Sequence, residues 1–174
     1  MKTILNEQQL AITIQRLSNQ LLENHLELKN TILIGIQPRG IYFSERVIRE
    51  LSKQISLGNI SYGKLDITFY RDDVRQGLHT INRTDILFSI ENKNVILIDD
   101  VLYTGRTIRA ALDALLDFGR PSKVELCVLI DRRFSRQLPI QPDYVGKAID
   151  SIISQKVKVF WKEKDGKDEV TLIE

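Results

Sequence analysis

The stretch that decides the fold lies just past the middle of the chain and reads Val95-Ile96-Leu97-Ile98-Asp99-Asp100-Val101-Leu102-Tyr103-Thr104-Gly105-Arg106-Thr107. Its first four residues form a continuous apolar run, which is typical of a strand buried on both faces of a parallel sheet. Two acids follow this run, and a short loop then leads through Thr, Gly and Thr into a predicted helix. In open α/β sheets, ligands bind at the carboxyl ends of the strands. The stretch therefore predicts a ligand site in an α/β protein.

The residue types in this stretch suit a phosphorylated sugar. The free N–H groups at a helix start, together with the hydroxyls of Thr104 and Thr107, favour a phosphate. Gly105 lets the backbone approach a ligand closely, and Arg106 adds positive charge. The two acids would repel a phosphate, so they are better suited to sugar hydroxyls or to a metal ion that bridges hydroxyls. Together these features indicate a site for ribose 5-phosphate.

Other interpretations of these motifs have less support. An acidic pair can cap a turn and Thr-Gly can start a helix without binding anything, but the length of the whole string makes this less favoured. Gly35 and Gly40 have the glycine spacing of a P-loop, yet Ile41-Tyr42 stands where that motif requires Lys-Ser or Lys-Thr. No G-x-G-x-x-G pattern follows a predicted strand. The sequence thus gives little support to an ATPase or a dinucleotide dehydrogenase.

Hydrophobic spacing along the rest of the chain predicts strands that alternate with helices. We expect helices over residues 7–28, 40–56 and 106–118, strands over 31–36, 65–69, 95–98 and 124–130, a long loop over 71–84, and a C-terminal hairpin over 156–174 that turns at Asp165-Gly166. This order favours a parallel α/β sheet in a single domain over residues 1–174.

Composition narrows the choices further. The 174 residues include 25 Lys and Arg against 23 Asp and Glu, a net charge of +2, so the chain has no strong overall field for a polyanion. One cysteine, Cys127, excludes a disulfide framework, and two distant histidines disfavour a histidine-rich metal centre. No segment approaches the roughly 20 apolar residues of a membrane span, and the first residues lack a signal-peptide pattern. We therefore expect a cytoplasmic protein with no membrane partner.

The stretch from Val95 to Thr107 closely resembles the phosphoribosyl-pyrophosphate (PRPP) signature of the type I phosphoribosyltransferases. Ile34 to Tyr42 resembles the pyrophosphate loop of the same enzymes. Other segments are similar to one family among them, the PyrR family of pyrimidine operon regulators and uracil phosphoribosyltransferases. These segments are Leu65 to Asp73, Thr104 to Leu115, Gly119 to Pro121, Asp131 to Arg133 and Leu138 to Lys147. The resemblance covers roughly residues 10–162. It implies the type I phosphoribosyltransferase fold, with a mostly parallel central sheet flanked by helices, a small hood and a flexible active-site flap over 71–84.

The resemblance implies that the protein is a uracil phosphoribosyltransferase, a pentosyltransferase that forms UMP and pyrophosphate from uracil and PRPP with Mg²⁺. Asp99, Asp100 and Arg71 are the implied catalytic residues. Further implied PRPP contacts are Pro38, Arg39 and Gly40 for pyrophosphate, Arg83 from the flap, and Val101, Leu102, Tyr103, Thr104, Gly105, Arg106 and Thr107 around the 5-phosphate. Arg75 is an alternative flap cation to Arg71 and Arg83. Mg²⁺ would be held mostly by oxygens of PRPP and water, with no direct protein ligand.

Two positions bear on the choice of base. Purine-using relatives place an Asp before Thr-Gly and a Lys before Pro-Asp-aromatic-Val, whereas this chain has Tyr103 and Gln141 there. Loss of both purine-reading groups favours a pyrimidine, and the neutral amide of Gln141 can pair with uracil. By resemblance, Tyr144 stacks on the base and Val145 offers backbone groups; the alternative is that Tyr144 is a core aromatic at a strand end. A purine phosphoribosyltransferase is the alternative activity.

Many PyrR family members also bind a stem-loop in the mRNA leader of the pyrimidine operon when UMP or UTP is bound. The resemblance therefore implies a second function in transcription attenuation, with Arg16, Arg132, Arg133 and Arg136 as candidate RNA contacts. Two departures touch this surface, because Asn19 lies near the place of an expected histidine and residues 131–137 differ from the usual loop. The alternatives are solvated arginines, or a non-catalytic regulator that senses PRPP or nucleotides. We expect a homodimer or homotetramer.

Overall fold

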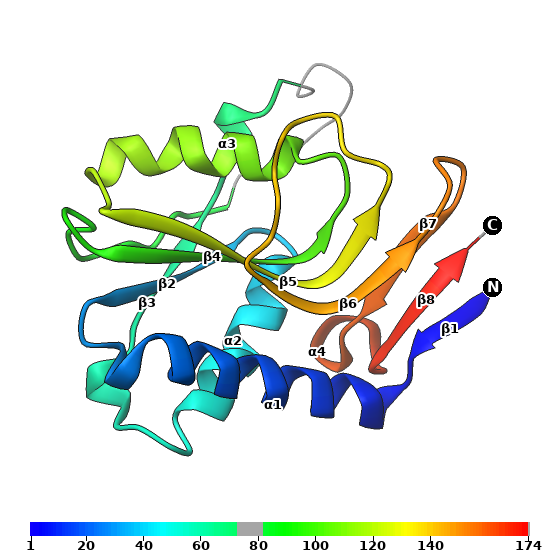
Figure 1. Cartoon of the computed structure of the whole chain (residues 1–174), viewed down its shortest axis with the longest axis horizontal. Helices are drawn as coiled ribbons and strands as arrows, with labels where there is room; N and C mark the ends of the chain where they lie inside the picture. The colour runs from blue at the N-terminus through cyan, green and yellow to red at the C-terminus, as the bar shows by residue number, and fades with distance from the viewer. Residues whose placement is uncertain (73–81, 174) are drawn as a thin grey trace.

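A five-stranded parallel sheet forms the centre of the molecule in the computed structural model, which describes residues 1–72 and 82–173 (Figure 1). The strands follow the order β3-β2-β4-β5-β6, and every neighbouring pair is parallel. Their bounds are β2 (Thr31–Ile36), β3 (Ser61–Leu65), β4 (Asn94–Leu102), β5 (Lys123–Arg133) and β6 (Tyr144–Asp150). Because all strands run the same way, their carboxyl ends meet at one edge of the sheet, where the predicted site residues gather.

Helices cover both faces of this sheet. Helices α1 (Glu7–Asn24) and α2 (Gly40–Leu51) pack on one face, and α3 (Arg106–Leu115) packs on the other (Figure 1). Strand β4 contributes alternate residues to the two cores: Ile96 and Ile98 face α1 and α2, whereas Val95 and Leu97 face α3. This two-sided burial is the pattern predicted from the apolar run. Short 3₁₀ helices are η1 (Leu26–Leu28), η2 (Leu57–Asn59), η3 (Thr68–Tyr70) and η5 (Leu116–Phe118).

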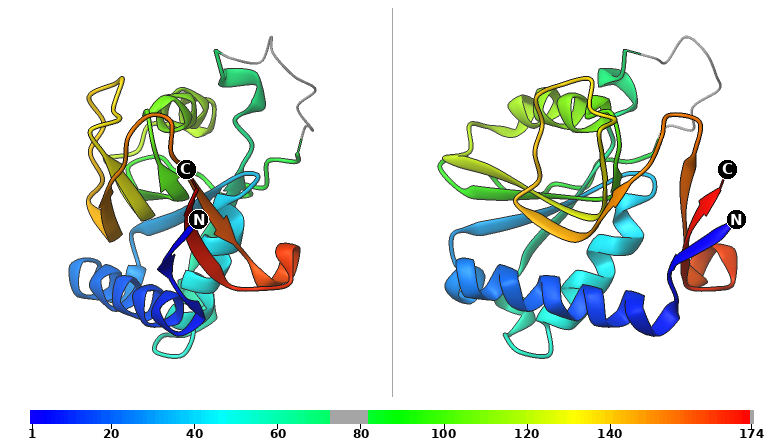
Figure 2. Two further views of the ribbon diagram at one scale, coloured as in Figure 1. Left: turned by 90° about the vertical axis from the view of Figure 1, so that its right-hand side faces the viewer. Right: turned by 45° about the vertical axis from the view of Figure 1, so that its right-hand side comes forward.

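A second, three-stranded antiparallel sheet forms a hood beside the carboxyl edge of the first. It has the order β1-β8-β7, with β1 (Lys2–Leu5), β7 (Lys156–Phe160), β8 (Glu169–Ile173) and the short α4 (Lys162–Asp165). The two ends of the chain therefore lie side by side, as Figure 2 shows. Trp161 is fully buried and stacks 6.4 Å from the ring of Phe43, so the hood is packed onto α2. The pairing of β7 with β8 agrees with the predicted C-terminal hairpin.

The predicted strand over residues 65–69 is wrong. Strand β3 ends at Leu65, and the chain then turns into η3 because the Asp66 carboxylate accepts a hydrogen bond from the backbone N–H of Thr68 at 2.9 Å. The apparent alternation arises from burial of Leu65 and Ile67, but Phe69 is 77% exposed.

Other strands and helices of the structure also differ from those expected from the sequence. The strands over residues 2–5 and 144–150 were not predicted, α1 ends at 24 rather than 28, and α2 ends at 51 rather than 56. Over the described ranges 1–72 and 82–173, no helix is long and apolar enough to cross a membrane.

Candidate active site

The carboxyl end of β4, the following loop and the start of α3 line a pocket of about 290 Å³. Its lining residues, all of them predicted site residues except Ile108 and Gln137, are Arg71, Asp99, Val101, Leu102, Tyr103, Thr104, Gly105, Arg106, Thr107, Ile108 and Gln137. Contributions from Arg71 and Gln137 bring two more distant loops to the same cavity. The structure thus places the predicted 5-phosphate cup and one of the two acids on a single concave surface.

Two glycines determine how tightly this edge is built. Gly105 immediately precedes α3 with a φ of +93°, a conformation that glycine adopts at little cost and other residues rarely adopt. This turn brings the first residues of α3 to the pocket, where backbone N–H groups have no partner within the helix. At the start of α2, a Cβ on Gly40 would lie 2.7 Å from the carbonyl oxygen of Ile98. Only a glycine therefore allows the predicted pyrophosphate loop to pack this closely against β4.

Asp99 and Asp100 are buried side by side near the carboxyl end of β4, each 7% exposed. Burial raises the pKa of Asp99 well above its usual range, and the neighbouring charge of Asp100 raises it further. Burial also raises the pKa of Asp100, although the Arg39 guanidinium offsets part of this shift. The protein alone therefore stabilises the charged forms of these acids poorly, which is expected where a cation or hydroxyl-bearing ligand completes the site.

Of the three predicted pyrophosphate residues, Arg39 contacts both Asp100 and the hood. The bond before Pro38 is cis, and Arg39 follows directly before α2. The Nε of Arg39 donates to Asp100 at 3.3 Å, and its terminal nitrogen lies 3.6 Å from Asp165 in α4. That nitrogen also donates to the backbone carbonyl of Val159 in the hood. Arg39 thus connects Asp100 to the C-terminal hairpin, a long-range contact that no local sequence pattern indicates.

The two predicted flap arginines lie on opposite ends of the segment over 71–84. Arg71 donates to the hydroxyl of Thr107 at 3.2 Å, which places it on the phosphate cup. Arg83 is exposed, and its backbone carbonyl accepts a hydrogen bond of 2.7 Å from the side chain of Gln37.

A third cation of the pocket, Arg106, pairs with Asp72 at 2.6 Å and donates to the side chain of Gln137 at 2.8 Å. Arg75 lies outside the described residues.

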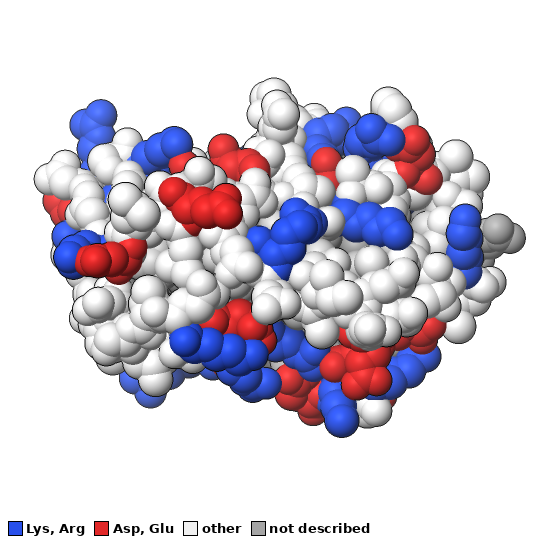
Figure 3. All heavy atoms as spheres, turned by 60° about the horizontal axis from the view of Figure 1, so that its bottom comes forward, with Lys and Arg blue, Asp and Glu red and all other residues white. Residues whose placement is uncertain are grey.

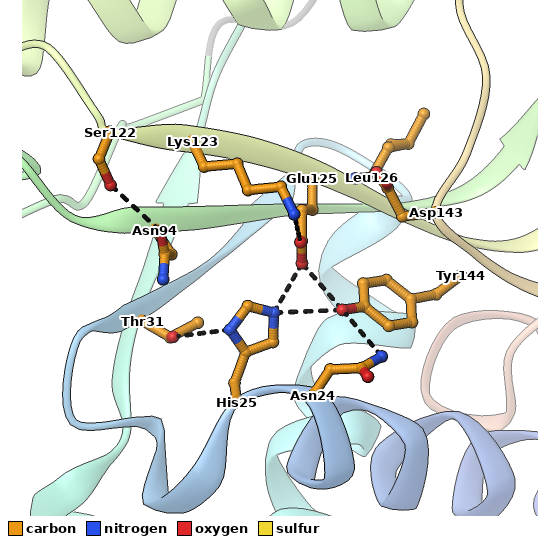
Figure 4. A network of polar contacts seen from close by, with 10 residues as sticks. All are labelled: Asn24, His25, Thr31, Asn94, Ser122, Lys123, Glu125, Leu126, Asp143 and Tyr144. Atoms are coloured by element: carbon orange, nitrogen blue, oxygen red, sulfur yellow. Dashed lines mark hydrogen bonds and ion pairs between the residues drawn. The ribbon is translucent and has the colours of Figure 1, made fainter.

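The structure does not bring the predicted base-binding residues to the pocket. Tyr144 is 3% exposed, and its hydroxyl donates to Glu125 at 2.8 Å within a buried network at the amino ends of the strands (Figure 4). A stacking ring needs one face open to a ligand, so this burial contradicts the stacking role and matches the alternative of a core aromatic. Gln141 is exposed, and the carbonyl of Val145 accepts a hydrogen bond from Arg16 at 3.1 Å.

Two of the four predicted RNA contacts instead brace the phosphate loop. Arg132 is 4% exposed, stacks 3.9 Å from the ring of Tyr103, and donates to Ser151 at 2.9 Å. Arg136 donates to the backbone carbonyl of Tyr103 and pairs with Asp131. The assignment of Arg132 and Arg136 to RNA is therefore corrected, because both guanidinium groups are committed to contacts inside the protein.

The other two predicted RNA contacts remain at the surface. Arg133 pairs with Asp150 at 2.8 Å and keeps half of its side chain exposed. Arg16 is exposed and donates to the carbonyl of Gly146 at 2.6 Å. In the view of Figure 3, onto the side that carries α1, acidic and basic side chains are interspersed.

A single family model, the phosphoribosyl transferase domain, matches residues 1–164, so the chain belongs to the phosphoribosyltransferases. Three curated relatives resolve the family further, all with the name "Bifunctional protein PyrR". One from Elusimicrobium minutum is 47% identical over 99% of this chain and 96% of the relative. Relatives from a Picosynechococcus species and from Limosilactobacillus fermentum are 45% and 44% identical over 98% and 91% of the chain, and 96% and 90% of those proteins. The chain is a member of the PyrR family.

The match to the Elusimicrobium minutum relative covers 99% of the chain, so it extends beyond residues 10–162 and includes the C-terminal hairpin. Solved structures support the fold. The chain is similar to a hypoxanthine phosphoribosyltransferase from Staphylococcus aureus, with a TM-score of 0.72 at 24% identity, over 97% of this chain and 90% of that one. It is also similar to the Trypanosoma cruzi hypoxanthine phosphoribosyltransferase, with a TM-score of 0.71 at 16% identity, over 99% and 95% of the two chains. At these identities the likeness defines the fold alone.

Proposed function

We propose that the protein transfers the phosphoribosyl group of PRPP to uracil, forming UMP and pyrophosphate, and that it also regulates pyrimidine genes in response to UMP or UTP. The observation that carries the first activity is the pocket of about 290 Å³ that joins a buried carboxylate to a helix start. A ribose 5-phosphate has one strong anion and several hydroxyl groups. The start of α3 suits the anion, and the acids suit the hydroxyls.

The chemistry asked of the protein is modest. The bond from ribose C1 to pyrophosphate breaks, a bond from C1 to N1 of uracil forms, and the proton of N1 passes to the released pyrophosphate or to water. Asp99 and Asp100 hold the ribose hydroxyls and place negative charge near a C1 that becomes electron-poor. The backbone from Leu102 to Thr107 holds the 5-phosphate, and Arg39 and Arg71 supply positive charge to the phosphates. Fixing both reactants in this geometry and excluding water provide much of the rate acceleration.

The donor set fits Mg²⁺, because the ion prefers oxygen ligands and the ionised forms of Asp99 and Asp100 are poorly compensated by the protein. When bound through the oxygens of PRPP, Mg²⁺ supplies positive charge that stabilises the leaving pyrophosphate. The Asp99 carboxylate lines the pocket, and with the neighbouring Asp100 it would orient the hydroxyls of the ribose. Within the part of the chain that the structure describes, no group of three acidic, histidine or cysteine residues is arranged around one point.

Base selection tests the proposed activity most economically. Purified protein is supplied with PRPP and Mg²⁺ and, separately, with uracil, orotate, hypoxanthine or guanine. We expect UMP from uracil and at least about tenfold lower rates with the other bases, since a site built for one hydrogen-bond pattern rejects others. Preferred use of hypoxanthine or guanine would instead support the purine alternative. PRPP binding without any nucleotide product would support a non-catalytic sensor.

The regulatory half of the proposal is supported by the name of the relatives, "Bifunctional protein PyrR", which implies a second role beside catalysis. Arg16 and Arg133 remain the candidate RNA contacts, because both lie at the surface. Their neighbours Val145, Gly146 and Asp150 lie on β6, so the two arginines flank one strand.

Binding to the cell's own pyrimidine leader transcript tests this half. We expect UMP to tighten binding, and Arg133→Ala to weaken it while reducing the slope of log K against log salt by about 1, the loss of one phosphate contact. Arg120→Ala, an exposed arginine near the end of α3, is the matched control and should bind like the wild type. Equal slopes for all three proteins would remove Arg133 from the RNA surface.

We propose a homodimer or homotetramer in the cytoplasm, which light scattering after size exclusion and fractionation of the source cells would test. A monomer at micromolar concentration would contradict the proposed oligomeric state.

A further inference from the structure

The carboxylate of Asp66, at the end of β3, joins two segments that are distant in sequence. One oxygen accepts hydrogen bonds from the backbone N–H of Thr68 at 2.9 Å and from its hydroxyl at 2.6 Å. The other oxygen accepts from the backbone N–H of Asn82 at 2.6 Å, across 16 residues of sequence. Asp66 is 9% exposed, so its charge is buried and satisfied by three donors. One side chain thus binds both the segment that leaves the sheet and the segment that returns.

Further contacts hold the returning segment. The backbone N–H of Asp66 donates to the hydroxyl of Thr84 at 3.0 Å. Lys64 and Asp85 exchange backbone hydrogen bonds of 2.9 and 2.8 Å in an isolated antiparallel bridge. These contacts, together with the one from Asn82, fix the returning chain against β3.

Gln37 connects the same segment to the pyrophosphate loop. Its backbone N–H donates to the carbonyl of Leu65 at 2.9 Å, and its side-chain amide donates to the carbonyl of Arg83 at 2.7 Å. Gln37 is 8% exposed and directly precedes Pro38 and Arg39. The position of Arg83 is therefore tied to the loop that precedes α2.

The outgoing segment leads to the pocket. The bonds from Thr68 to Asp66 start η3 (Thr68–Tyr70), and Arg71 is the next residue. Arg71 donates to Thr107 and lines the same cavity as Asp99. The orientation of this guanidinium thus depends on a turn whose first hydrogen bonds are made by Asp66.

We propose that Asp66, assisted by Gln37, is a positioning residue that sets Arg71 and Arg83 for PRPP. This inference rests on the proposed function. It assigns a role to Asp66, which lies in the segment over 65–69 that the sequence pattern predicts to be a strand. The position requires a carboxylate, because both side-chain oxygens of Asp66 accept hydrogen bonds. In Asp66→Asn one of them becomes an NH₂ group, which would face the N–H of Asn82 or the donors of Thr68.

Asp66→Asn tests the proposal, with Asp85→Asn as the matched control. Asp85 lies on the same segment and loses the same charge, but its side chain is exposed and its bonds to Lys64 use the backbone. We expect calorimetry with PRPP and Mg²⁺ to give about tenfold weaker binding for Asp66→Asn, because small misplacements of binding groups are costly. The KM for uracil should change less than about twofold. Asp85→Asn should match the wild type in both measurements.

A double-mutant cycle separates positioning from general stability. If Asp66 acts through Arg71, adding Asp66→Asn to Arg71→Ala should weaken PRPP binding by less than about twofold more. Full additivity would overturn the proposal, as would a lower melting temperature for Asp66→Asn with unchanged PRPP affinity. If Asp66→Asn does not fold, Gln37→Met takes its place, with a smaller loss of affinity expected and an unchanged affinity contradicting the role.

The binding measurement also keeps this inference distinct from the proposed function. If the wild-type protein binds PRPP but produces no UMP, the proposed reaction fails while the affinities still decide the role of Asp66. If the wild-type protein does not bind PRPP, both are overturned.

Discussion

Buried carboxylates lie at opposite edges of the same parallel sheet, a pair at one edge and Glu125 alone at the other, and they differ in how their charge is stabilised. At the carboxyl edge, Asp99 and Asp100 have pKa values raised by burial, with only partial compensation from Arg39. At the amino edge, burial also raises the pKa of Glu125, but hydrogen bonds from Lys123, His25 and Tyr144 outweigh it and leave the pKa below its ordinary value. The comparison teaches that the protein fully compensates the buried charge of Glu125 at the amino edge, whereas it compensates those of Asp99 and Asp100 at the carboxyl edge only in part.

The amino-edge network is a complete set of internal partners (Figure 4). Nε2 of His25 lies 2.6 Å from Glu125 and 3.1 Å from the hydroxyl of Tyr144, and Nδ1 lies 3.1 Å from the hydroxyl of Thr31. His25 directly follows α1, and the other members lie on β2, β5 and β6. The network therefore fastens the end of α1 to three strands.

The largest expected effect separates the two edges by activity. Asp100→Asn should lower kcat/KM for UMP formation by about 10²–10³-fold, the usual cost of removing a preorganised electrostatic contact in the transition state. Its melting temperature should not fall, since it removes a poorly compensated buried charge. The rate of UMP formation with saturating uracil measures this. Turnover within about twofold of the wild type would remove Asp100 from the site.

At the amino edge, a substitution is expected to lower stability while leaving activity nearly unchanged. Glu125→Gln should lower the free energy of unfolding by about 2 kcal/mol, because buried hydrogen bonds to a charged group are lost or weakened. UMP formation below the melting temperature should stay within about twofold, since the network lies away from the pocket. Urea unfolding and the UMP assay, run on the same preparation, give both values. Lost activity in a folded Glu125→Gln protein would break the comparison.

The smallest effect is in the pH dependence of stability, where the two edges have opposite signs. The lowered pKa of Glu125 adds stability above the pKa of the unfolded chain, and this stability is lost as the pH falls through the folded pKa. The raised pKa of Asp99 does the reverse, since its penalty develops as the pH rises from the unfolded value towards the folded one. As the pH is lowered from neutral to acid, the melting temperature should fall less steeply for Glu125→Gln than for the wild type. Asp99→Asn should gain stability over the wild type as the pH rises.

The sequence predicted the carboxyl edge better than the amino edge for a physical reason. The apolar run over 95–98, the two acids and Gly105 are contiguous, so local rules on strands, turns and helix starts describe that site. Tyr144 gave no such signal, because its partner Glu125 is 19 residues away and His25 is 119 residues away. An aromatic residue after Pro-Asp is compatible with a base site or with a core, and only the tertiary fold decides.

Long-range contacts explain the other misses as well. Strand β1 has four residues and forms by pairing with β8 at the far end of the chain, which no local pattern indicates. Arg132 and Arg136 lie in a polar stretch of sequence that is typical of an exposed loop. In the structure Arg132 stacks on the ring of Tyr103, and Arg136 donates to the backbone carbonyl of Tyr103. The failed strand over 65–69 differs, because Asp66 and Thr68 form a local turn that competes with an alternating pattern.

The most direct test of the carboxyl edge is the affinity for PRPP with Mg²⁺, measured by calorimetry at neutral pH for the wild type, Asp100→Asn and Glu125→Gln. We expect at least about tenfold weaker binding for Asp100→Asn, and binding within about twofold of the wild type for Glu125→Gln, because only the acid at the carboxyl edge is proposed to contact PRPP. Wild-type affinity in Asp100→Asn, or an equal loss in both variants, would contradict the assignment of the PRPP site to the acids of β4.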